Sequence, residues 1–263
     1  KKDDFYYLEE TQIRFDNGII SISGKYAPKG DYDLWCDMNN IELVKINQLF
    51  NINHRLTGNS TGTLHISNLT SYPILLSNFV IRNGNIDEII FKECSGKISF
   101  RQNRFLITDL VITTEIGNFN ADGWLTTNGN FDNGRIFIPN DSLNVSVEFE
   151  KFELSSLNRY IPWGMESGGE LSGKGKIKGK ADDLEIDLNT EIRNPYFDKI
   201  NGNYLTGRLV YVNSNLYVSG LKFITDDGEY TLTGSLPIIL SLVEKTENNI
   251  NKLPLDIMIT GNF

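Results

Sequence analysis

The chain contains an internal repeat, and this repeat constrains its fold more than any other feature of the sequence. When the sequence is shifted by 111 positions, the second half aligns without a gap on the first over about 85 residues. Five glycines fall on glycines in this alignment: Gly58, Gly62, Gly96, Gly117 and Gly123 on Gly169, Gly173, Gly207, Gly228 and Gly234. A gapless match that keeps its glycines predicts two copies of one structural unit, and stacked units form long continuous surfaces.

The repeat also divides the chain. Residues 31–140 form the first copy and residues 141–253 the second copy. We assign residues 1–30 to the end of a preceding repeat and residues 254–263 to the start of a further, truncated one. The pattern therefore leads us to expect a segment of a longer protein.

Apolar and polar residues alternate along most of both copies. Leu184, Ile186 and Leu188, for example, alternate with acidic and amide residues. Successive side chains of a strand point to opposite faces, so each such segment has one apolar and one polar face. Turn motifs rich in Gly and Asn, such as Asp16–Gly18 and Arg82–Gly84, recur about every ten residues. The pattern predicts an antiparallel sheet, because parallel sheets covered on both faces show continuous apolar runs instead.

The alternation is lost at the same place in each copy, at residues 41–50 and 152–161, and both segments fit a short helix better. A sheet with one apolar face must bury it, and a closed barrel, a sandwich of two sheets or a curled trough would each do so. The length of the repeating unit favours the trough. The predicted fold class is therefore all-β, an elongated, curled antiparallel sheet of tandem repeats with one short helix per repeat.

The sequence offers little for catalysis or for binding of nucleic acid. The net charge is −9 and no basic cluster follows a strand face, which argues against a nucleic-acid partner. No nucleophile elbow, phosphate-binding loop or zinc-protease motif is present, so we predict no enzyme activity, no cofactor and no metal site. The sequence leaves open whether the two cysteines, Cys36 and Cys94, form a disulfide.

Both copies share one cadence of glycine, strand, two-residue turn, strand and glycine. It is carried by Gly62–Ile66 and Gly173–Ile177, by the Ile-Arg-Asn motifs at residues 81–83 and 192–194, and by the glycine-bounded blocks at residues 96–123 and 207–234. This cadence resembles the repeat of the AsmA-like superfamily, of the TamB (translocation and assembly module) type. The resemblance covers nearly the whole chain and implies a curled sheet with a hydrophobic groove along its inside, a β-taco.

The resemblance also implies a role in the envelope of a diderm bacterium. Proteins of this family cross the periplasm from an inner-membrane anchor and carry phospholipids towards the outer membrane. The TamB type is also connected with outer-membrane protein assembly through a barrel partner. The resemblance thus implies a periplasmic segment with phospholipids as ligands, an inner-membrane anchor upstream in the full chain and an outer-membrane barrel as a further partner.

We expect the apolar residues of the alternating segments to line the groove. In the first copy these are Leu64, Ile66, Ile98, Phe100, Phe105, Ile107, Ile112 and Phe119. In the second copy they are Ile177, Ile186, Leu188, Leu209, Tyr211, Leu216, Val218, Phe223, Tyr230 and Leu232. A continuous apolar wall suits acyl chains, because each buried CH₂ contributes about 0.8 kcal/mol.

Two other functions remain compatible with this sequence. In a structural or adhesive cell-surface β-repeat protein, the same apolar residues would form a closed core and contact no lipid. In a carbohydrate-binding β-fold, aromatic residues of the polar phase would be exposed, and Trp35, Trp124 and Trp163 are the candidates.

Overall fold

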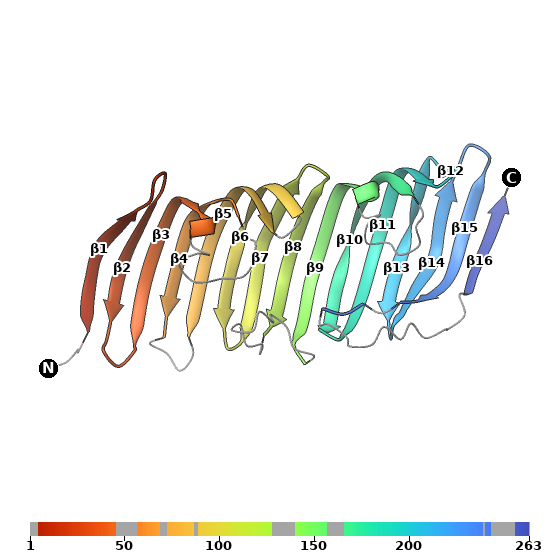
Figure 1. Ribbon diagram of the computed structural model, residues 1–263. Helices are drawn as coiled ribbons and strands as arrows, with labels where there is room; N and C mark the ends of the chain where they lie inside the picture. Colours follow the sequence, from red (N-terminus) through yellow and green to blue (C-terminus); the bar gives the residue numbers. More distant parts are fainter. Residues whose placement is uncertain are drawn as a thin grey trace. The chain divides into compact units, whose positions relative to one another are not determined.

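The computed structural model describes residues 5–45, 57–68, 73–86, 89–127, 140–156, 166–238, 240–242 and 256–262. Within these ranges the chain is almost entirely antiparallel strand, and hydrogen-bonded neighbours follow the sequence order, which confirms the predicted fold class (Figure 1). The chain divides into two compact units. Unit one comprises Lys1–Glu115 and Ala121–Thr126, and unit two comprises Ile116–Asn120 and Thr127–Phe263. No helix of the described ranges is long and apolar enough to cross a membrane.

Unit one is built from consecutive strands that pair with their sequence neighbours. They are β1 (Tyr6–Arg14), β2 (Ile19–Tyr26), β3 (Tyr32–Glu42), β4 (Asn59–Ser67), β5 (Ile74–Ile86), β6 (Ile89–Arg101), β7 (Arg104–Thr114) and most of β8 (Asn118–Thr126). Among the described strands of this unit, pairing beyond the sequence neighbour is absent, so the sheet stays open instead of closing into a barrel.

Unit two repeats this arrangement. Its strands are β9 (Ser142–Glu153), β10 (Ser167–Lys180), β11 (Asp183–Phe197), β12 (Ile200–Asn201), β13 (Tyr204–Val212), β14 (Asn215–Ile224), β15 (Glu229–Pro237) and β16 (Asp256–Asn262). The short β12 pairs with β11 alone, and β11 pairs onward with β13. The described strands of this unit also leave the sheet open.

A β-bulge recurs at the same place in both units. Asn40 in β3 and Lys151 in β9, which are 111 positions apart, both have a left-handed backbone with φ of 53°. The amide of Asn40 donates to the hydroxyl of Thr61 at 3.1 Å, and that of Lys151 donates to the hydroxyl of Ser172 at 3.0 Å. The pairing register shifts beside both bulges. Because a bulge bends its strand and increases the local twist, the strands curl at this end of each unit (Figure 1).

The bulge explains why the predicted helices begin later than expected. Ile41 and Phe152 were both assigned to the helices by the sequence pattern, and this is wrong, since they continue β3 and β9. The extra residue of the bulge shifts the apolar phase, so the alternation is lost although the strand continues. Residues 43–45 are helical and residues 154–156 form a 3₁₀ turn. The remaining predicted helical positions, 46–50 and 157–161, lie outside the described residues.

A second sequence motif was also misassigned. The Arg82–Gly84 segment, predicted to be a turn, lies inside β5. Asn83 and its equivalent Asn194 in β11 have φ of 51° and 49°, so each is a left-handed residue within a continuing strand. Asn213 and Ser214, by contrast, do form a turn, and they join β13 to β14 with φ of 52° and 59°.

Each unit has a buried cluster of apolar residues near the bulge. In unit one the cluster consists of Ile81, Phe91 and Cys94, with Leu43, Phe79, Leu110 and Ile112 packed against it. In unit two it consists of Leu154, Ile192, Leu205 and Phe223, with Leu171, Phe197, Leu221, Tyr230 and Leu232 packed against it. The curled end of each sheet therefore buries its own apolar side chains.

The two cysteines differ in burial. Cys94 in β6 belongs to the buried cluster of unit one, whereas Cys36 in β3 is partly exposed, and both are free thiols. Burial raises the pKa of Cys94 to about 11, and burial together with the charge of Asp37 raises the pKa of Cys36 as well. Since the thiolate is the reactive form, we predict that iodoacetamide at neutral pH modifies buried Cys94 more slowly than Cys36. Peptide mass spectrometry measures both rates, which should converge in urea. Equal rates in the folded protein would contradict the burial of Cys94.

Candidate functional site

The register of unit one aligns apolar side chains in rows across the strands. One row contains Leu34, Ile66, Leu75, Phe100 and Phe105, each directly opposite the next. A second row contains Cys36, Leu64, Ser77, Ile98 and Ile107. Directly opposed residues of paired strands point to the same face of the sheet. The two rows therefore form one apolar face.

Unit two has equivalent rows. The first contains Val145, Ile177, Ile186, Tyr211, Leu216 and Leu236, and the second contains Val147, Gly175, Leu188, Leu209, Val218 and Gly234. Phe100 and Tyr211, which are 111 positions apart, occupy equivalent places in the first rows. The two copies therefore share both the order of their strands and the face of the sheet on which equivalent side chains lie.

These rows are less buried than the clusters at the curled ends. Except for Val147 and Tyr211, all their members are partly exposed, whereas Phe91 of the cluster in unit one is only 1% exposed. Apolar surface that stays partly in contact with water favours a ligand that covers it, by about 25 cal/mol for each Å² removed from water. An apolar chain laid across the strands would cover this surface.

Thirteen of the eighteen residues predicted to line a groove lie in these rows. Those in the rows are Leu64, Ile66, Ile98, Phe100, Phe105 and Ile107 of unit one and Ile177, Ile186, Leu188, Leu209, Tyr211, Leu216 and Val218 of unit two. Four others, Ile112, Phe223, Tyr230 and Leu232, belong to the buried clusters or pack against them. Phe119 is half-buried in β8. That any of these residues contacts a lipid stays a prediction.

The sequence-based set omits residues from the first strand of each copy. Leu34 on β3 and Val145 and Val147 on β9 share the apolar faces with the predicted residues. Leu75 on β5 does so as well. The alternation in β3 and β9 is as regular as in the chosen segments, so the same argument extended to these strands would have found them.

In unit two, the chain after β15 runs along the ends of the strands, past the β13–β14 turn and on to the β10–β11 turn (Figure 1). We call its described residues, Ile238 and Leu240–Leu242, the strap. Three of its backbone amides donate hydrogen bonds to the sheet: Ile238 to the Ser214 carbonyl at 3.0 Å, Leu240 to the Tyr211 hydroxyl at 2.9 Å and Leu242 to the Ala181 carbonyl at 2.8 Å. Tyr211 is 2% exposed and Ala181 is fully buried. The strap therefore lies against Tyr211 of the first row in this unit.

The opposite face of unit two is charged. Lys174, Lys176, Lys178 and Lys180 of β10 stand opposite Asn189, Asp187, Glu185 and Asp183 of β11. The Lys178 ammonium lies 2.8 Å from the Glu185 carboxylate, and both oxygens of Asp187 accept hydrogen bonds from Arg208 at 2.7 Å. The Arg208 hydrogen bond lowers the pKa of Asp187, and the Glu185 hydrogen bond raises the pKa of Lys178. Paired and hydrated charges make this face a poor surface for acyl chains.

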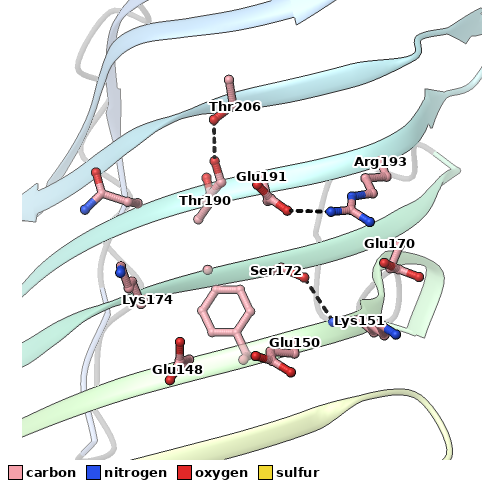
Figure 2. Close-up of a pocket in the computed structure, with 13 residues that line it drawn as sticks. Glu148, Glu150, Lys151, Glu170, Ser172, Lys174, Thr190, Glu191, Arg193 and Thr206 are labelled. Carbon is pink, nitrogen blue, oxygen red and sulfur yellow. Dashed lines mark hydrogen bonds and ion pairs between the residues drawn. The ribbon is translucent and has the colours of Figure 1, made fainter.

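A hollow of about 470 Å³ lies on this charged face, next to the bulge at Lys151 (Figure 2). Its charged lining residues are Glu148, Glu150, Glu170, Glu191, Lys151, Lys174 and Arg193. The Arg193 guanidinium lies 3.6 Å from the Glu191 carboxylate. The other acidic and basic side chains are mixed around the lining of the hollow. This mixture gives no single sign of charge that would select an ionic ligand. Among the described residues, no group of three or more His, Cys, Asp or Glu side chains could hold a metal ion.

The tryptophans bear on the carbohydrate hypothesis. Trp35 is 50% exposed on the polar face of unit one, where its ring stacks on His65 with centroids 4.0 Å apart. Trp124 is covered by the guanidinium of Arg104, 4.5 Å from the ring centroid. Trp163 lies outside the described residues. Trp35 is thus one exposed aromatic side chain on the polar phase, whereas the apolar rows extend over several strands.

Comparison of the chain with known protein families, with curated proteins and with solved structures finds no match. The apolar rows of the two units and the sequence pattern of the repeat are therefore the features from which a function can be inferred.

The second row of unit two requires a glycine, which gives a test of the register. A Cβ atom on Gly175 would overlap the carbonyl oxygen of Asp187 and lie 2.8 Å from the Cα atom of Leu188. We predict that Gly175→Val lowers the free energy of unfolding by about 2 kcal/mol through overpacking. The adjacent Lys174→Val, on the exposed charged face, should change it by less than about 0.5 kcal/mol. Urea unfolding measures both, and equal effects would contradict this register.

Proposed function

We propose that the chain is a lipid-conducting segment in which phospholipid acyl chains lie on the apolar rows. The carrying observation is that each unit presents rows of apolar side chains, most of them partly exposed, which continue from strand to strand. In this arrangement the acyl chains would contact the rows and the headgroup would stay in water. No covalent chemistry is required.

The apolar rows would allow the acyl chain of a lipid to slide along them. Their members are mainly aliphatic, and they repeat at the strand spacing of about 4.8 Å, so successive positions differ little for a methylene chain. Each CH₂ that the rows cover contributes about 0.8 kcal/mol, which holds a chain without a deep specific pocket. The charged opposite face of unit two would stay hydrated, which confines the lipid to one side of the sheet.

The cellular setting is proposed from the AsmA-like, TamB-type cadence of the repeat. On this proposal the segment works in the periplasm of a diderm bacterium, within a bridge that connects the inner and outer membranes. An inner-membrane anchor elsewhere in the full protein would hold it, and an outer-membrane barrel would be a further partner in outer-membrane protein assembly.

The test compares two apolar residues on opposite faces of the same sheet. Phe100 is in the first row of unit one, whereas Leu106, on the adjacent strand, is 47% exposed on the polar face. We predict that Phe100→Asp reduces lipid binding at least about tenfold, because it places a charge among the apolar side chains. Leu106→Asp should leave lipid binding unchanged.

Native mass spectrometry of the protein purified from bacterial cells measures bound phospholipid, and circular dichroism shows whether both variants remain folded. A wild-type protein without bound lipid or uptake of an apolar dye would exclude the lipid function. It would favour the structural or adhesive alternative, in which apolar faces close on themselves. The buried Tyr211 under the strap is the observation that favours this alternative in unit two.

A further inference from the structure

Tyr211 and Phe100 occupy equivalent positions but have different surroundings. Phe100 is partly exposed and packs on Phe105, with ring centroids 4.6 Å apart. Tyr211 is 2% exposed, and its hydroxyl accepts a hydrogen bond from the Leu240 amide at 2.9 Å. The hydroxyl that Phe100 lacks is therefore one of the groups that hold the strap in unit two, and it is the one that lies in the apolar row.

The strap brings apolar side chains to an apolar row. Leu236 ends this row opposite Leu216, and the chain continues directly from it into the strap. Ile238 and Leu240 are both half-buried. The strap side chains are three aliphatic groups and one hydroxyl, that of Ser241, which donates to the Ala181 carbonyl at 3.3 Å. The half-buried side chains of Ile238 and Leu240 are the part of the strap that an acyl chain could replace, whereas Leu242 is 46% exposed.

We propose that the strap is a built-in competitor for acyl chains, which has to leave Tyr211 and Ala181 before a lipid chain occupies the first row of unit two. This inference rests on the proposed lipid function. Unit one would accept a chain on the Phe100 row without this step. In unit two, the strap would regulate access to the equivalent row.

Competition follows from the way in which the strap is held. It belongs to the same chain as the row, so its effective concentration at the row is high. It is attached by a few hydrogen bonds, each with a modest net free energy, so release is accessible. The apparent affinity of the row for lipid is then lowered by the fraction of molecules in which the strap is released.

A reversible cross-link tests the inference. Ala181→Cys with Leu242→Cys, in a chain that also carries Cys36→Ser and Cys94→Ala, would tie the strap to the β10–β11 turn when oxidised. The probe is a phospholipid with a photoactivatable acyl chain, and labelled peptides are mapped by mass spectrometry. We expect the reduced protein to be labelled on β6–β7 and on β13–β14. Oxidation should reduce labelling of β13–β14 at least about fivefold and leave β6–β7 unchanged as the internal control.

Tyr211→Phe provides a second variant, because it gives unit two the residue found at the equivalent position of unit one. Loss of the hydroxyl should speed hydrogen exchange at the Leu240 amide about fivefold or more and increase labelling of β13–β14. Leu216→Met, in the same row but without a bond to the strap, is the matched control and should leave this exchange rate unchanged.

The outcomes separate the inference from the function on which it rests. Labelling of β13–β14 that is equal in both redox states, with β6–β7 also labelled, would overturn the strap and leave the lipid function standing. Where the cross-link does not form for reasons of side-chain geometry, the Tyr211→Phe variant decides instead, and unchanged hydrogen exchange at the Leu240 amide would overturn the inference. No labelling of β6–β7 would overturn the lipid function. In that case, unchanged Leu240 exchange in Tyr211→Phe would reject the attachment of the strap as well.

Discussion

The paired bulges at Asn40 and Lys151 are the local constraint on which the rest of each unit depends. A left-handed backbone at a residue other than glycine is unfavourable. Each bulge also takes one backbone amide out of the strand pairing, and a hydroxyl on the neighbouring strand accepts a hydrogen bond from that amide. The resulting bend gathers the apolar residues beyond the bulge into a buried cluster. The straight part of each strand keeps its apolar side chains in open rows. In each copy, this bulge thus lies between a buried core and a more open apolar surface.

Much of the fold follows from the sequence because period-two alternation directly encodes which face a side chain occupies. Leu184, Ile186 and Leu188 were assigned to one face by their spacing alone, and the register places each of them on the apolar face. The same reasoning failed at Ile41 and Phe152, since loss of alternation has two physical causes. A change to helix and a bulge within a strand give the same local pattern. Asn40 tolerates the left-handed backbone and so gives a hint of a bulge, whereas Lys151 gives none.

The candidate site could be predicted only in part, because burial depends on contacts between distant residues. We expected both Ile112 and Ile107 to line the groove, yet Ile112 packs against a buried cluster and Ile107 lies in an open row. The distinction depends on where the strand bends. The strap is harder still to foresee, since Leu240 and Tyr211 are 29 positions apart and no periodic pattern connects them. The available signal was the exchange of Phe100 for Tyr211 between otherwise matching copies, which adds a hydroxyl to an apolar row.

Strand pairing between sequence neighbours has a consequence for how each unit would assemble and come apart. A strand can join the sheet as soon as its predecessor is in place, because its partner was synthesised just before it. Contacts of short sequence separation cost little loop-closure entropy, so such a sheet can grow by addition from one end. Disassembly would follow the reverse order. Because each strand is held mainly by its sequence neighbours, removal of an edge strand exposes only the next one, so under mechanical load or heat such a sheet would unravel strand by strand.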